Sequence, residues 1–120
     1  MKGSQPPRKI PILMMMGRTD LSVPLVTTIA IRDAVIARYA LSGPEALTRD
    51  SNYTHQRWTN PDGGTLEVFE HGYELPEWDN GHCIPGGTLH DGFYAYACSL
   101  PNAFNWGKEV VRFFQAHPMP

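Results

Sequence analysis

The segment from Lys9 to Gly17 is a short, almost unbroken apolar run, Lys-Ile-Pro-Ile-Leu-Met-Met-Met-Gly, that ends in glycine. A strand of a parallel sheet is covered on both faces and needs no polar alternation, so this pattern predicts a buried strand over residues 9–17. A flexible methionine-rich surface is the alternative, which the length and the closing glycine disfavour. The turn at 18–24 then places Asp20 just beyond a strand's carboxyl end, where open α/β sheets carry functional groups.

An amphipathic helix is predicted after this turn. Between Pro24 and Leu41, apolar residues recur at helical spacing with charged residues interleaved. Pro24 is suited to begin the helix and Gly43-Pro44 to end it. The helix would connect the first strand to the next part of the sheet. The following residues, 45–52, have no regular pattern, and we expect them to be irregular.

Two alternating segments, 53–59 and 65–71, predict a β-hairpin. The residues between them, Asn60-Pro61-Asp62-Gly63-Gly64, favour a turn strongly. His55 and His71 fall on the two predicted strands and could face each other as a polar pair. The chain thus predicts an α/β fold made of a buried strand, a crossover helix, a hairpin and a terminal helix.

The terminal helix is predicted to begin after Asn102 or Asn105, either of which can cap it, and to run to about Gln115. One face of this helix is expected to be buried through Trp106, Val110, Phe113 and Phe114. His117 would complement the dipole at the end of the helix. The preceding residues, 88–101, are rich in aromatic side chains and give no clear assignment.

Length and composition bound the class of protein. With 120 residues, 42% of them hydrophobic and 18% charged, the chain fits one domain. A net charge of −2 gives no basic field for nucleic acid. No apolar run approaches the roughly 18 to 20 residues of a membrane-spanning helix, so we expect a soluble protein. Residues 1–9 have no hydrophobic segment of a signal peptide and are expected to be a linker, which leaves 10–120 as the domain.

The loop from Asn80 to Gly87, Asn-Gly-His-Cys-Ile-Pro-Gly-Gly, holds a histidine between residues that fix the shape of a loop. Its glycines permit close backbone approach, and Pro85 fixes φ. Imidazole titrates nearer to neutrality than other side chains, so His82 is a candidate general base. A surface loop whose histidine only caps a turn is the alternative.

The order of these parts resembles the C-terminal third of an α/β-hydrolase. In that fold the nucleophile, acid and histidine follow one another along the chain. The family's Gly-x-x-Asp-x-x-Val-Pro acid turn is matched by Gly17, Asp20, Val23 and Pro24. Within the superfamily, residues 81–87 are similar to the Gly-His-x-Trp-Pro-Gly loop of secreted polyhydroxybutyrate depolymerases and feruloyl esterases, with Ile84 where that group usually has tryptophan.

The resemblance implies a serine carboxylic ester hydrolase in which Asp20 orients His82 and His82 activates a serine. It also implies secretion. The nucleophile is missing, however, because no Gly-x-Ser-x-Gly occurs in these 120 residues. No other nucleophile is expected, since Cys83 follows His82 directly and no serine has the strand-turn-helix context. The chain is therefore expected to be inactive alone and to need a missing N-terminal segment or another chain.

Cys83 and Cys98 are the only cysteines. A bridge between them would close a loop of about fifteen residues, worth roughly 3 kcal/mol in the chain-entropy model. In an extracellular protein we expect the bridge, which would pin the histidine loop. In a cytosolic protein we expect two buried thiols.

Other polar and aromatic groups give weaker signals. The histidines at 55, 71, 82 and 90, even with Asp79 or Asp91, lack the spacing of a metal site, so no metal or cofactor is expected. Glu74, Glu77 and Asp79 are expected to form a solvated acidic loop. The aromatic side chains either line a substrate pocket or pack in the core, and core packing is favoured: Trp78, Phe93, Tyr94, Tyr96 and Trp106.

The main functional hypothesis is therefore the acid-and-histidine part of an ester hydrolase, whose acyl and alcohol substrate parts the sequence does not specify. A non-catalytic interaction module is the alternative. An isolated late strand of such a sheet would expose an apolar edge, which could pair with another chain or with a second copy of this one.

Overall fold

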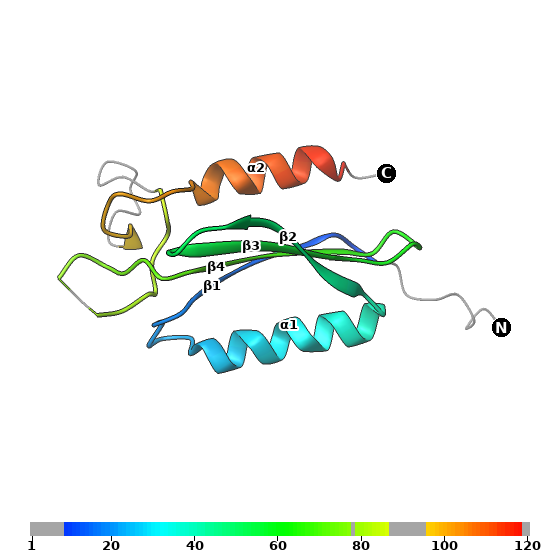
Figure 1. Ribbon diagram of the computed structural model, residues 1–120, viewed down its shortest axis with the longest axis horizontal. Coiled ribbons are helices and arrows are strands. Elements are labelled where there is room, and N and C mark those ends of the chain that lie inside the picture. The colour runs from blue at the N-terminus through cyan, green and yellow to red at the C-terminus, as the bar shows by residue number, and fades with distance from the viewer. Residues whose placement is uncertain (1–8, 78, 87–95, 119–120) are drawn as a thin grey trace.

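The computed structural model describes residues 9–77, 79–86 and 96–118 of the chain. Its helices and strands follow the order β1 (Ile12–Gly17), α1 (Leu25–Tyr39), β2 (Ser42–Arg49), β3 (Tyr53–Thr59), β4 (Thr65–His71) and α2 (Trp106–Ala116). The four strands form one mixed sheet in the order β1-β4-β3-β2. The sheet lies between the two helices, as Figure 1 shows, which makes this a small α/β domain.

The parallel pairing of β1 with β4 joins two segments about fifty residues apart. The register runs from Ile12 opposite Leu66 to Gly17 opposite His71. β3 and β4 form the predicted antiparallel hairpin, with Tyr53 opposite His71. The predicted strand and the hairpin are thus confirmed, although β1 is half-buried except at Met16 and Gly17. Because β1 and β4 are parallel, the turn after β1 and the loop after β4 leave the same end of the sheet.

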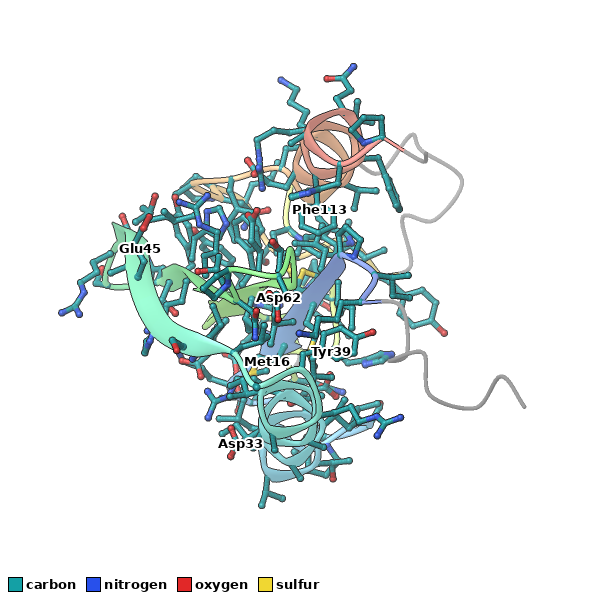
Figure 2. All side chains as sticks on the ribbon, turned by 90° about the vertical axis from the view of Figure 1, so that its right-hand side faces the viewer. Met16, Asp33, Tyr39, Glu45, Asp62 and Phe113 are labelled. Carbon is teal, nitrogen blue, oxygen red and sulfur yellow. A yellow bond between two sulfur atoms is a disulfide. The ribbon has the colours of Figure 1, made fainter. Side chains whose placement is uncertain are left out.

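Each face of the sheet has its own apolar core. Toward α1 the buried side chains are Met16, Leu41, Trp58, Leu66 and Val68, and apolar residues of α1 pack against them. The other face holds Phe69, Tyr73, Cys83, Cys98 and Phe104, with Trp106 at the start of α2 packed beside them. Figure 2 shows the two helices end-on, with Phe113 between α2 and the sheet and Asp33 pointing away from it. Both faces are covered, as expected for a short parallel strand.

The prediction that residues 45–52 are irregular was wrong, because β2 runs from Ser42 to Arg49. The same strand contains Gly43 and Pro44, so they do not end α1, which instead stops at Tyr39 with Ala40 in the left-handed conformation. β2 pairs only with β3 in the described residues, and most of its side chains are exposed. An exposed edge strand needs no apolar alternation and tolerates proline, which explains why the pattern missed it.

α2 begins as predicted, since the Asn105 side chain accepts a hydrogen bond from the Lys108 N–H at 3.0 Å. The predicted buried face was wrong in one position. Phe113 is 1% exposed, but Phe114 is 66% exposed. Consecutive residues of a helix point about 100° apart, so both rings cannot face the sheet. Neither helix in the described ranges is long and apolar enough to cross a membrane.

Alanine substitution of the two neighbouring phenylalanines should show how much the burial of each ring contributes to stability, because the chemical change is the same in both. Phe113→Ala should lower the free energy of unfolding by about 3 to 5 kcal/mol, because it removes a fully buried ring. Phe114→Ala, the matched control on the exposed side of α2, should change it by less than about 0.5 kcal/mol. Urea denaturation at neutral pH measures both values. Equal losses in the two variants would show that α2 does not pack as described.

Candidate active site

Asp20 and His82 meet at the end of the sheet although 62 residues separate them. Asp20 lies in the turn after β1 and His82 in the loop after β4. Their side chains are joined by a contact of 3.0 Å between His82 Nδ1 and Asp20 Oδ2. The Asp20 side chain is 11% exposed and that of His82 is 40% exposed. The pair therefore has a largely shielded acid and an imidazole that solvent can reach.

The turn after β1 fixes the Asp20 carboxylate. Its Oδ1 atom accepts hydrogen bonds from the backbone N–H groups of Ser22 and Val23, each at 2.8 Å, which leaves Oδ2 for His82. Burial alone would raise the pKa of Asp20, but the hydrogen bonds from Val23, His82 and Ser22 outweigh it and hold this pKa below its ordinary value. Asp20 is therefore ionised at neutral pH.

An ionised carboxylate only accepts hydrogen bonds, so the proton in the Asp20–His82 contact belongs to His82 Nδ1. In the neutral imidazole the other nitrogen, Nε2, then carries a lone pair. This is the tautomer that a general base needs, with Nε2 free to take a proton.

Asn80 ties the two loops together. Its side-chain oxygen accepts hydrogen bonds from the backbone N–H groups of Leu21 at 3.1 Å and His82 at 3.0 Å. The Gly81 N–H also donates to the Thr19 carbonyl at 3.1 Å. A Cβ on Gly17 would overlap the Gly81 carbonyl, so only glycine allows β1 to approach this loop so closely. The sequence analysis missed the role of Asn80, which the Asn-Gly turn pattern could have suggested.

The other side of the histidine loop is held by a disulfide. Cys83 and Cys98 are bonded, with their Cα atoms 5.0 Å apart. The sequence had left this bridge and two free thiols as alternatives. Ile84 forms an isolated parallel bridge with Ala97 beside the disulfide. The backbone around His82 is therefore fixed on both sides, which limits how far the imidazole can move from Asp20.

A cavity of about 390 Å³ opens beside the pair. Most of its lining is apolar, and it draws on β1, α1 and the histidine loop: Met15, Met16, Gly17, Asp20, Val23, Thr28, His71, Gly81, His82, Cys83, Ile84 and Tyr96. The Tyr96 ring meets the His82 ring edge-on at 5.8 Å between centroids. A reacting group next to His82 would thus have one side against apolar atoms and the other against the imidazole.

His71 is a second imidazole in this wall, and it differs sharply from His82. It is 1% exposed, and its Nδ1 atom has no hydrogen-bond partner. Burial lowers the pKa of His71 to about 4, with only partial opposition from backbone groups of Tyr73 and Cys83. His71 is therefore neutral at neutral pH, although it lies in the wall of the same cavity as the partly exposed His82. Its strand position was predicted, but its burial was not.

The histidine pair predicted across the hairpin does not exist, because His55 lies opposite Phe69 and not opposite His71. His55 instead contacts buried Glu67 at 2.6 Å, and Arg112 donates to the same carboxylate oxygen at 2.7 Å. Burial would raise the pKa of Glu67, but these two hydrogen bonds lower it below its ordinary value. This buried network joins β3, β4 and α2, and the sequence analysis missed it.

The remaining candidates are scattered. Glu74 accepts a hydrogen bond from the Thr19 hydroxyl at 2.8 Å and so supports the acid turn, whereas Glu77 and Asp79 are exposed. Trp106 packs in the core against Phe69. The other candidates lie outside the described residues: Trp78, His90, Asp91, Phe93 and Tyr94.

Comparisons with models of protein families, with curated proteins and with solved structures find no match to this chain. Functional interpretation therefore depends on the geometry of Asp20, His82 and their surroundings.

The buried His71 predicts a specific loss of stability in mild acid. Its pKa is about 4 in the folded chain and near 6.5 when unfolded. Between these values the unfolded chain binds the extra proton, so the free energy of unfolding should fall by about 3 kcal/mol as pH drops from 6.5 to 4. Stability lost through the lowered pKa values of Asp20 and Glu67 should begin near their ordinary values, 3.8 and 4.5, and should grow as pH falls below them.

Urea denaturation at several pH values, with the disulfide intact, measures this effect. His71→Leu should flatten the profile between pH 6.5 and 4, while His117→Ala, a histidine at the end of α2, should keep the profile of the parent chain. An unchanged slope in His71→Leu would contradict the assignment.

Proposed function

We propose that this chain supplies the acid and the base of a serine carboxylic ester hydrolase. The observation that carries the proposal is the hydrogen bond between Asp20 and His82, with His82 Nε2 left as a base beside a largely apolar cavity. Nucleophilic acyl transfer requires an acid, an imidazole oriented by that acid and a cavity for the substrate next to the serine. Asp20, His82 and the cavity beside them would supply these parts.

In this mechanism Asp20 holds the tautomer and orientation of His82 and stabilises the imidazolium that forms. His82 takes the proton from a serine hydroxyl while the serine oxygen bonds to the ester carbonyl carbon. The proton then passes from His82 to the leaving alcohol, and an acyl-serine remains. Water attacks the acyl-serine in the same way, with His82 again taking and returning a proton. The serine and the oxyanion donors come from a further segment or from another chain.

The proposed fold is that of an α/β-hydrolase, with the polyhydroxybutyrate depolymerase and feruloyl esterase group as the nearest resemblance. Three features support it. The acid follows β1, and the histidine follows the neighbouring parallel strand β4. The helix α1 comes after β1 in the chain and packs on one face of the sheet. The Cys83–Cys98 bridge supports an oxidising, extracellular setting, in line with the secreted members of that group.

In this proposal the rest of such a sheet would attach at the edge of β1. In the described residues β1 pairs with β4 on one side only. The turn that follows β1 also carries exposed apolar residues, including Leu21 at 72% and Val23 at 39% exposure. Further parallel strands could continue the sheet from this edge, and the nucleophile would follow one of them.

The activity test uses the native protein, purified from the cells that produce it through a tag on this chain. Any further segment or partner chain is then isolated together with it. A fluorophosphonate probe labels a serine only where a base activates it. We expect one labelled serine and hydrolysis of short-chain p-nitrophenyl esters. Asp20→Asn should lower kcat roughly 10⁴-fold. His82→Ala should lower it by a factor on the order of 10⁶ and abolish labelling.

Two residues outside the site provide matched controls, exposed Asp33 on α1 and His117 at the end of α2. Asp33→Asn and His117→Ala make the same chemical changes away from the site and should keep both labelling and hydrolysis. The 120-residue chain alone should not hydrolyse the ester faster than its His82→Ala variant does, because it has no Gly-x-Ser-x-Gly. Unchanged hydrolysis by the isolated native protein after His82→Ala would reject the proposed function.

A second candidate function is a non-catalytic interaction module, favoured by the same open edge of β1. Unpaired N–H and C=O groups on a strand edge bind another strand readily. In this alternative the partner is another protein chain or a second copy, and the Asp20–His82 contact only stabilises the loop.

Size-exclusion chromatography with mass detection over a range of concentrations tests edge pairing. An exposed edge should make the 120-residue chain associate as its concentration rises, and it should bind a dye that reports apolar surface. A strict monomer that binds no dye would count against both the open edge and the module.

A further inference from the structure

The disulfide of the histidine loop lies against an unpartnered imidazole. His71 is 1% exposed and its Nδ1 atom makes no hydrogen bond. Native proteins leave few buried polar atoms without a partner, so each such atom needs an explanation. Neither the proposed acid–base pair nor the core packing uses this nitrogen.

His71, Cys83 and Cys98 form the one group of buried metal-ligand residues within the described ranges. A ring nitrogen of His71 and the two sulfur atoms all lie within 4.8 Å of one another. All three residues are almost fully buried, and they come from β4, the histidine loop and the segment before α2. The fold, not the local sequence, brings them together, so their spacing in the chain did not suggest a site.

We propose that reduction of the Cys83–Cys98 disulfide converts this cluster into a zinc site, with His71, Cys83 and Cys98 as the protein ligands. One imidazole nitrogen and two thiolates match the ligand preference of Zn²⁺, which is held by sulfur and nitrogen in a tetrahedral arrangement. His71 and Cys83 also line the cavity beside His82. Three protein ligands would leave the fourth position of a tetrahedral Zn²⁺ for water.

The conversion has two steps. A dithiol or phosphine reductant donates two electrons, the sulfur–sulfur bond breaks and, with two protons, two thiols form. Zn²⁺ then binds both sulfur atoms as thiolates, releases the two thiol protons and takes the lone pair of His71. In the oxidised state the disulfide joins the histidine loop to the segment before α2, and in the reduced state the metal would join both segments to His71 at the end of β4.

The test is titration of the 120-residue chain with Co²⁺ alone, before and after reduction by a phosphine under anaerobic conditions. Co²⁺ reports tetrahedral geometry through its visible bands and thiolate ligands through charge-transfer bands. The reduced chain should bind one Co²⁺ with both signatures, and Zn²⁺ should displace it. The oxidised chain should show neither signature, because its sulfur atoms are bonded to each other.

Two histidine variants make the test specific. His71→Leu should weaken Co²⁺ binding by more than about 100-fold, since even the outer hydrogen-bond partners of metal ligands contribute about 10 to 100-fold. His117→Ala should bind as tightly as the parent chain. If the reduced apo chain loses its fold, Zn²⁺ should restore the near-ultraviolet circular dichroism of the parent chain and not that of His71→Leu.

The proposal fails if the reduced parent chain gives no thiolate bands, if the oxidised chain binds Co²⁺ equally well, or if His71→Leu binds as tightly as the parent. None of these measurements uses ester hydrolysis, so the outcome is independent of the proposed function.

Discussion

The parallel pairing of β1 with β4 is the contact on which the rest of the structure depends. It aligns residues 12–17 with 66–71, so that the acid turn and the histidine loop leave the sheet side by side. Gly17 at the end of β1 then allows the Gly81 backbone to approach, and Asn80 bonds to both loops. The distance between Asp20 and His82 follows from this alignment. A shift of one residue in the register would turn each side chain of β1 to the other face.

The two faces of β4 explain how one strand supports both packing and chemistry. Leu66 and Val68 face α1 and pack in an apolar cluster with Met16 and Trp58. On the other face, buried Glu67 is bonded to His55 and Arg112, which hold it ionised without an unpaired charge. Removing one of these two partners would destabilise the fold strongly, because it would leave the buried carboxylate of Glu67 incompletely paired. The same face ends in His71, whose nitrogen has no such partner.

The sequence allowed the elements with strong local patterns to be predicted. The apolar run before Gly17, the hairpin around Asn60 to Gly64 and the cap of α2 at Asn105 all depend on nearby residues, and the structure has each of them. β2 was missed because an exposed edge strand carries little apolar periodicity. For the site, Asp20 and His82 were identified from the turns that present them. Glu67 and the surroundings of His71 were missed because their partners lie on other elements of the chain. The bond from Asn80 to the acid turn was missed for the same reason, although the Asn-Gly pattern could have suggested its bond within the histidine loop.

In the proposed mechanism Asp20 orients His82 so that Nε2 carries the lone pair of the neutral imidazole. Long-range proton–nitrogen NMR of the isolated chain at neutral pH tests this arrangement, because it identifies which imidazole nitrogen carries the proton. Neutral His82 should be protonated at Nδ1 with this proton hydrogen-bonded to Asp20, and Asp20→Ala should let the imidazole exchange between both tautomers. A neutral His82 protonated at Nε2 in the parent chain, or the same spectrum in Asp20→Ala, would contradict it.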